Sequence, residues 1–155
     1  TMQPIREFGR PIRQALKSLP RGVRVIAEPG RFIAGPSGTS IATVVGRAQR
    51  EGRWWYYLDD GLYGSYNGQL YDHARYPSDV PVRRGPTHPS VLAGPTCDSI
   101  DVVREDIPLP ELQIGDLVVG RMMGAYTACS ATDFNFIPRA KIVALNAQAR
   151  SQRAD

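Results

Sequence analysis

The chain has 155 residues, a mass of 17.1 kDa, 42% hydrophobic residues and a net charge of +4. This length and composition are typical of one globular domain with a substantial core. They exclude a transmembrane helical protein, because no apolar run approaches the roughly 20 residues needed to cross a bilayer. The first residues also lack the basic and apolar regions of a signal peptide, which predicts a cytoplasmic location with no membrane partner.

The 19 basic residues raise the question of nucleic-acid binding. They are spread along the chain, and the aromatic run from Trp54 to Tyr57 has the pattern of a buried strand, so we expect no nucleic-acid partner. A basic β-barrel that binds nucleic acid is kept as an alternative. Cys97 and Cys129 lie far apart and the chain has only two histidines. We therefore expect reduced thiols and no metal site.

Residues 4–18 carry apolar side chains at helical spacing, which predicts an amphipathic helix. Pro11 is expected to kink this helix or split it in two. Residues 23–27 then have the composition of a short strand that ends at Glu28. A helix followed by a strand is typical of parallel α/β folds, and a lone pair cannot form a sheet. We therefore interpret this pair as the last element of something larger.

The pattern changes near residue 36, after which turn residues separate short apolar runs. No long helical period follows. The sequence therefore predicts a mainly β fold, an antiparallel β-barrel or sandwich. The expected strands lie at residues 39–50, 53–58, 68–75, 81–84, 99–103, 116–123 and 136–145.

Three short motifs pair rigid backbone residues with side chains capable of chemistry. Residues 28–31 (Glu-Pro-Gly-Arg) offer a carboxylate and a guanidinium, and residues 94–98 (Gly-Pro-Thr-Cys-Asp) offer a thiol beside a carboxylate. Residues 124–127 (Gly-Ala-Tyr-Thr) offer a phenol. Taken singly, each motif also fits an ordinary role as a solvated ion pair, a small buried cysteine or a buried tyrosine. Their order along the chain favours a functional interpretation.

In this order the motifs resemble the C-terminal part of the fold-type III pyridoxal-phosphate decarboxylases, the ornithine, diaminopimelate and arginine decarboxylase family. Residues 60–67 (Asp-Gly-Leu-Tyr-Gly-Ser-Tyr-Asn) and 70–73 (Leu-Tyr-Asp-His) extend the resemblance over nearly the whole chain. The ornithine branch fits best, because Asp98 follows Cys97 where the diaminopimelate enzymes carry glutamate. We assign Tyr63 to packing rather than chemistry.

The resemblance also implies a division of the chain. Residues 1–36 would be the closing helix and final strand of a truncated, cofactor-binding (β/α)₈ barrel. Residues 37–147 would form the C-terminal β-domain, and residues 148–155 a flexible tail.

The resemblance implies a site for pyridoxal 5′-phosphate. In that site Glu28 would pair with the protonated pyridine nitrogen. Gly30 would allow a close backbone approach, and Arg31 and Tyr126 would bind the phosphate.

A substrate site for a diamino acid is implied by the same resemblance. Cys97 would act as the catalytic acid that protonates Cα. Asp98 and Asp72 would hold the distal ammonium of the substrate, with Tyr71 beside it. Phe134 would form part of the active-site wall at the dimer contact.

The chain has two lysines, Lys17 and Lys141, and neither lies in a family motif. The family attaches its cofactor to a lysine near the start of the barrel. We therefore expect this chain alone to be inactive and to need the N-terminal barrel portion of the same enzyme.

The sequence thus predicts part of a decarboxylase that converts L-ornithine to putrescine and carbon dioxide in polyamine biosynthesis, with lysine as a further substrate. The resemblance implies a homodimer with active sites at the interface, where Cys97 and Asp98 reach the cofactor of the partner subunit. The alternative is a non-catalytic homologue that acts as a regulatory binding protein. The presence of Asp72 and Tyr126 together with the Cys97–Asp98 pair argues against it.

Overall fold

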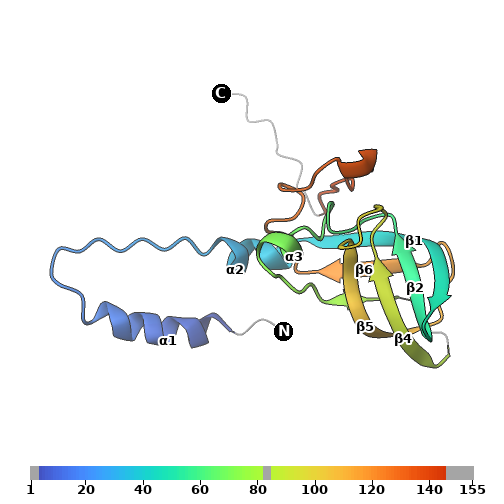
Figure 1. The fold of residues 1–155 in the computed structure, drawn as a ribbon. Helices are drawn as coiled ribbons and strands as arrows, with labels where there is room; N and C mark the ends of the chain where they lie inside the picture. Colours follow the sequence, from blue (N-terminus) through green and yellow to red (C-terminus); the bar gives the residue numbers. More distant parts are fainter. Residues whose placement is uncertain (1–3, 82–84, 146–155) are drawn as a thin grey trace.

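The computed structural model describes residues 4–81 and 85–145, so the predicted tail at 148–155 lies outside the described residues. A curled β-sheet forms one end of the molecule, and an N-terminal arm (residues 4–29) extends away from it (Figure 1). The part of the chain from residue 30 onward, which contains the sheet, is called the sheet domain. The helical elements are α1 (Ile5–Leu16), α2 (Gly30–Ala34), η1 (Gly35–Ser37), α3 (Gly68–Tyr71) and η2 (Phe134–Phe136). The strands are β1 (Thr39–Arg50), β2 (Arg53–Leu58), β3 (Ser78–Asp79), β4 (Thr87–Ala93), β5 (Val102–Pro110) and β6 (Leu117–Arg121).

The six strands form one sheet in the order β3-β6-β1-β2-β4-β5. Strand β1 is shared between two halves of this sheet, because residues 39–43 pair with β6 whereas residues 44–50 pair with β2. The register shifts between Val44 and Gly46, and such a bulge lets a strand bend. The expected mainly β fold is confirmed, although β2 and β4 run parallel, so the sheet is mixed rather than wholly antiparallel.

A tight hairpin joins β1 to β2. Arg50 pairs with Arg53, and the two residues between them, Glu51 and Gly52, both have positive φ angles of 50° and 75°. Two successive positive φ angles match a type I′ turn, whose twist fits the twist of the flanking strands.

The core lies on the inner face of the curled sheet. Strand β1 shows the alternation that creates this face, since Ala42 and Val44 are fully buried while Ile41 and Val45 are exposed. Burial of these apolar side chains is the main stabilising term for the sheet. The core residues are Ala42, Val44, Tyr56, Leu58, Leu62, Tyr66, Tyr76, Val80, Leu92, Val103, Leu109, Leu112, Val118 and Met123.

Two of the strands expected after residue 36 are wrong. In the segment 68–75 the chain instead forms the short helix α3, which packs Leu70 against the core and leaves Tyr71 exposed. Residues 136–145 contain no strand, and their large apolar side chains are exposed apart from the half-buried Ile137. A strand needs a hydrogen-bonded neighbour, and none pairs with this segment among residues 4–81 and 85–145.

The strands expected at 39–50 and 53–58 match β1 and β2, whereas the boundaries of other expected strands differ. The run expected at 81–84 lies largely outside the described residues, and the strand of that region is β4. The run expected at 99–103 corresponds to β5, which begins at Val102 and continues to Pro110.

The N-terminal arm does not contribute to the core. Helix α1 contains Pro11 without being split, and none of its residues is buried. Residues 23–27 are exposed and form no strand, which corrects the expected strand there. An isolated strand is unstable because its backbone groups lack partners. Within the part of the chain that the structure describes, no helix is long and apolar enough to cross a membrane.

Candidate active site

A first cluster of site residues forms where the arm enters the sheet domain. Helix α2 carries Arg31, and Asp72 immediately follows α3. Arg31 Nη2 donates a hydrogen bond to Asp72 Oδ2, which gives a half-exposed ion pair. The guanidinium carbon of Arg31 also lies 5.0 Å from the centroid of the Tyr126 ring. Gly30 faces the same ring, because a Cβ on it would lie 3.6 Å from the Tyr126 hydroxyl.

An open cavity of about 530 Å³ adjoins this first cluster. Its polar lining includes Arg31, Asp72 and Arg75, and its aromatic lining includes Phe8 and Phe32. Cationic donors beside aromatic and apolar walls suit a ligand that combines an anionic group with a flat ring. A guanidinium has five donors, so the bond from Arg31 to Asp72 leaves others for an anion. The residues therefore fit a phosphorylated aromatic cofactor.

The side chains of two predicted residues near this cluster make no hydrogen bond or ion pair with it in the described part of the chain. The Glu28 side chain is exposed and forms no hydrogen bond or ion pair within the described residues; its carbonyl oxygen accepts from Gly30 N at 2.9 Å. Tyr71 lies next to Asp72 in the chain, and its side chain is exposed. The structure thus brings Gly30, Arg31 and Tyr126 together but not Glu28.

A second cluster surrounds the turn at residues 94–98. The Tyr63 hydroxyl donates a hydrogen bond to Asp98 Oδ2, and the Tyr63 ring stacks on Phe134 with centroids 4.4 Å apart. Cys97 is exposed, and its Sγ lies 3.5 Å from the amide oxygen of Asn135. The sheet domain thus gathers a thiol, a carboxylate and two aromatic rings on one surface.

The bond between Tyr63 and Asp98 changes the acidity of both groups. It raises the pKa of Tyr63 to about 12, because ionising the phenol would destroy the donor and place two negative charges together. The same bond, helped by Ile100 N, lowers the pKa of the Asp98 carboxyl. Asp98 is therefore firmly anionic at neutral pH, as a residue that binds an ammonium must be.

The contact of Tyr63 was missed from the sequence. Assigning this residue to packing was incomplete, since it both stacks on Phe134 and holds Asp98. The two partners lie 35 positions apart, and no spacing rule joins them. The motifs likewise assign no role to Asn135, although its side-chain oxygen is the hydrogen-bond acceptor for Cys97.

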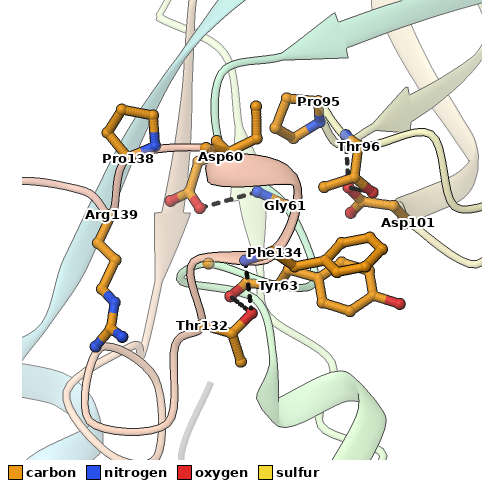
Figure 2. Close-up of a pocket in the computed structure, with 12 residues that line it drawn as sticks. Asp60, Gly61, Tyr63, Pro95, Thr96, Asp101, Thr132, Phe134, Pro138 and Arg139 are labelled. Carbon is orange, nitrogen blue, oxygen red and sulfur yellow. Dashed lines mark hydrogen bonds between the residues drawn. The ribbon is translucent and has the colours of Figure 1, made fainter.

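Behind the second cluster lie two buried carboxylates, Asp60 and Asp101, which line a small pocket (Figure 2). Asp60 Oδ1 accepts from the backbone nitrogens of Gly61 and Ser65 at 2.9 and 2.8 Å, whereas its Oδ2 has no hydrogen-bond partner among the described residues. Asp101 accepts hydrogen bonds from Thr96, as Figure 2 shows. These groups support the loops on which Tyr63 and the 94–98 turn are carried.

The two clusters make no direct contact with each other within the described part of one chain. The members of the first are Gly30, Arg31, Asp72 and Tyr126, and those of the second are Tyr63, Cys97, Asp98, Phe134 and Asn135. Among residues 4–81 and 85–145, no hydrogen bond, ion pair, stacking contact or cation–π contact joins a member of one cluster to a member of the other. Asp72 is engaged by Arg31 and Asp98 by Tyr63. The two carboxylates therefore have different partners within one chain, and the expected arrangement around one ammonium stays a prediction.

Neither lysine is a member of either cluster. Lys17 follows α1 and Lys141 lies in the segment after η2, and both are exposed. Neither makes a hydrogen bond or ion pair with a cluster residue in the described ranges. Over the same residues, no group of three or more His, Cys, Asp or Glu side chains could hold a metal ion.

Comparisons of the sequence and of the structure with known proteins point to the same family. Residues 32–124 match the family described as "Pyridoxal-dependent decarboxylase, C-terminal sheet domain". The structure resembles the lysine/ornithine decarboxylase of Vibrio vulnificus complexed with cadaverine, with 57% identity and a TM-score of 0.88 over 94% of this chain and 40% of that one.

Curated relatives agree with this match. The lysine/ornithine decarboxylase of Selenomonas ruminantium is 44% identical over 72% of this chain and 28% of its own length. The chloroplastic ornithine decarboxylase of Nicotiana glauca is 41% identical over 77% of this chain and 30% of its own length. The chain therefore spans about 30% of the length of these relatives.

Proposed function

Because this chain belongs to the pyridoxal-dependent decarboxylases and carries their C-terminal sheet domain, we propose that it is the C-terminal part of an L-ornithine or L-lysine decarboxylase. The reaction would convert ornithine to putrescine, or lysine to cadaverine, with release of carbon dioxide. The observation that carries this proposal is the second cluster. It places an anionic Asp98, held by Tyr63, directly after Cys97 on an accessible turn.

The first cluster would hold the cofactor. Arg31 and Tyr126 would bind the phosphate of pyridoxal 5′-phosphate, Gly30 would allow close approach, and Glu28 would pair with the pyridine nitrogen. When bound, the cofactor supplies the electron sink for the bond to the departing carboxyl group. Its attachment lysine would come from the N-terminal barrel, because neither Lys17 nor Lys141 lies in a cluster.

The second cluster would handle the substrate. Cys97 would deliver a proton to Cα after carbon dioxide has left, and its exposure allows it to reach a ligand from outside this chain. Asp98 would hold the distal ammonium together with Asp72, and Tyr71 and Phe134 would border the site. Two carboxylates around one ammonium favour a diamino acid over a substrate with a neutral side chain.

The separation of the clusters supports an active site built at the interface of a homodimer. Asp72 and Asp98 have different partners within one chain, Arg31 and Tyr63, which fits an arrangement in which the two carboxylates at one substrate come from different subunits. We propose that Cys97 and Asp98 act on the cofactor held by the partner subunit. The proposed division into a barrel segment at 1–36 and a β-domain at 37–147 follows from the same assignment.

Replacing Asp98 by Asn tests the substrate assignment. In the complete enzyme, the specificity constant kcat/KM is measured for L-ornithine, for L-lysine and for L-norvaline, which lacks the distal amine. Loss of a charge-assisted bond worth about 1.5–3 kcal/mol should lower the value for the diamino acids about 10- to 100-fold and leave L-norvaline nearly unchanged.

Asp106→Asn is the matched control, because Asp106 is an exposed carboxylate on β5 that pairs with Arg53 away from the cluster. It should leave all three specificity constants unchanged. Equal losses for charged and neutral substrates in Asp98→Asn would overturn the diamino-acid assignment. A parent enzyme that releases no carbon dioxide from either diamino acid would favour the non-catalytic binding homologue.

A further inference from the structure

Asp101 is a buried carboxylate directly behind the turn that carries Cys97 and Asp98. Its exposed fraction is 3%, and both oxygens are engaged. Oδ1 accepts from Leu62 N at 2.7 Å, and Oδ2 accepts from Thr96 N at 3.1 Å and Thr96 Oγ1 at 2.7 Å. A buried carboxylate is tolerated only with such donors, so the surrounding loops are organised around it.

The backbone of Asp101 closes the same turn from both ends. Gly94 N donates to the Asp101 carbonyl at 2.7 Å, and Asp101 N donates to the Asp98 carbonyl at 3.0 Å. Together with the two bonds from Thr96, these contacts fix the path of residues 94–101. By contrast, Cys97 itself makes two long contacts, from its N and Sγ to Asn135 Oδ1 at 3.4 and 3.5 Å.

Asp101 also ties this turn to the loop that carries Tyr63. Leu62, whose nitrogen donates to Asp101, directly precedes Tyr63, whose hydroxyl donates to Asp98. The loops approach so closely that a Cβ on Gly61 or Gly94 would lie 2.3 or 2.1 Å from Asp101 Oδ1. Glycine at both positions therefore allows one carboxylate to join the two loops.

We propose that Asp101 is a positioning residue that sets where Cys97 and Asp98 stand relative to the substrate, acting through Thr96 and Leu62. The inference rests on the proposed decarboxylase function. Asp101 touches neither substrate nor cofactor in this proposal. Its effect is to hold the thiol where its proton reaches Cα, and a displacement of about 1 Å can cost about 100-fold in rate.

The first experiment measures where the proton goes in the complete enzyme. Protonation of Cα yields the diamine. Protonation on the cofactor side consumes one water, releases carbon dioxide and 4-aminobutanal from ornithine, and leaves the α-nitrogen on the cofactor as pyridoxamine 5′-phosphate. In either orientation of its amide, Asp101→Asn places an N–H₂ opposite a donor, Leu62 N or those of Thr96, so we expect kcat to fall about 10- to 100-fold and the aldehyde fraction to rise.

Three variants separate positioning from general damage. Thr96→Val removes the hydroxyl donor and should raise the aldehyde fraction, whereas Thr96→Ser retains the donor and should restore the parent fraction. Ser90→Ala is the matched control, because Ser90 is also buried (0% exposed) but its hydroxyl donates to the His88 carbonyl within β4, away from the turn. It should leave the aldehyde fraction at the parent value. If Asp101→Asn does not fold, the Thr96 pair still decides.

A second readout needs no activity. In the cofactor-free enzyme, the alkylation rate of Cys97 by iodoacetamide is compared with that of Cys129, an exposed cysteine on another loop. Loosening of the turn in Asp101→Asn and Thr96→Val should raise the Cys97 rate relative to Cys129. An unchanged ratio with an unchanged aldehyde fraction would overturn the positioning role. A changed ratio in an enzyme that decarboxylates no diamino acid would retain the structural link and reject the proposed function.

Discussion

The N-terminal arm and the sheet domain have similar apolar content but reach different degrees of burial. Helix α1 presents Ile5, Phe8, Ile12 and Leu16 at helical spacing, yet none of its residues is buried. Strand β1 places Ala42 and Val44 at 0% exposure because β2 and β6 flank it and the curled sheet covers its inner face. Apolar patterning thus selects an element, whereas burial requires a partner surface, which the sheet domain supplies for itself and the arm does not.

The strongest test of this difference removes one apolar side chain from each region. Leu58→Ala should lower the free energy of unfolding by about 2–5 kcal/mol, because Leu58 is fully buried in the core. Ile12→Ala should change it by less than about 0.5 kcal/mol, because Ile12 is 56% exposed. Urea denaturation of the chain measures both, and a similar loss in the two variants would contradict the comparison.

A second prediction concerns the joint between the regions. A Cβ on Gly124 would lie 1.9 Å from the Ala34 carbonyl oxygen, which is backbone and cannot move aside cheaply. Gly124→Ala should therefore destabilise the chain by about 1–3 kcal/mol or more. Gly46→Ala is the control, since its Cβ would meet the Tyr57 side chain at an ordinary 3.5 Å. Equal unfolding midpoints for the two variants would show that the joint is not tightly packed.

Removing the arm should have a smaller effect. A chain that begins at Gly30 loses the edge contact between Phe8 and Phe32, whose ring centroids are 5.5 Å apart. Such a contact is worth about 0.5–1.5 kcal/mol. The shortened chain should therefore keep the cooperative thermal unfolding of the sheet domain. A loss of several kcal/mol would mean that the arm stabilises the sheet in a way that its exposure does not suggest.

The smallest effect is expected at alkaline pH. Because the bond to Asp98 raises the pKa of Tyr63 from 10.0 to about 12, its contribution to stability is complete below pH about 10 and is lost as the pH rises toward about 12. Tyr63→Phe should weaken this pH dependence, whereas Tyr66, whose pKa is also raised to about 12 by burial, retains its share. Denaturant midpoints across this pH range measure the difference. Identical curves for parent and variant would contradict the assigned bond.

Sequence patterns predicted the regular parts of the fold well. Strands β1 and β2 lie where their alternation and composition place them, at residues 39–50 and 53–58. Alternation could not distinguish a strand from one helical turn at 68–71, because so short a run satisfies both periods. It also failed at 23–27, since strand composition does not supply the neighbouring strand on which pairing depends.

The candidate site was predicted in part. The motif order identified Arg31, Tyr126, Cys97 and Asp98, and the structure brings the first two of these together and places the last two on one turn. It did not predict Asp101, because no chemical signature distinguishes a buried carboxylate from a turn residue in a linear pattern. For the same reason, the motif order predicted the packing of Tyr63 but not its hydrogen bond to Asp98.

The division of β1 between two partners has a consequence for the order of folding. Its second half meets β2 across the tight turn at Glu51 and Gly52, so this pairing is local and can form early. Its first half pairs with β6, so the pairing of Thr39 with Arg121 can form only after residue 121 has been synthesised. Closing so long a loop is slow. Until β6 is complete, the edge of Thr39–Thr43 lacks its partner and can pair with other strands, which exposes nascent chains to misassembly at this step.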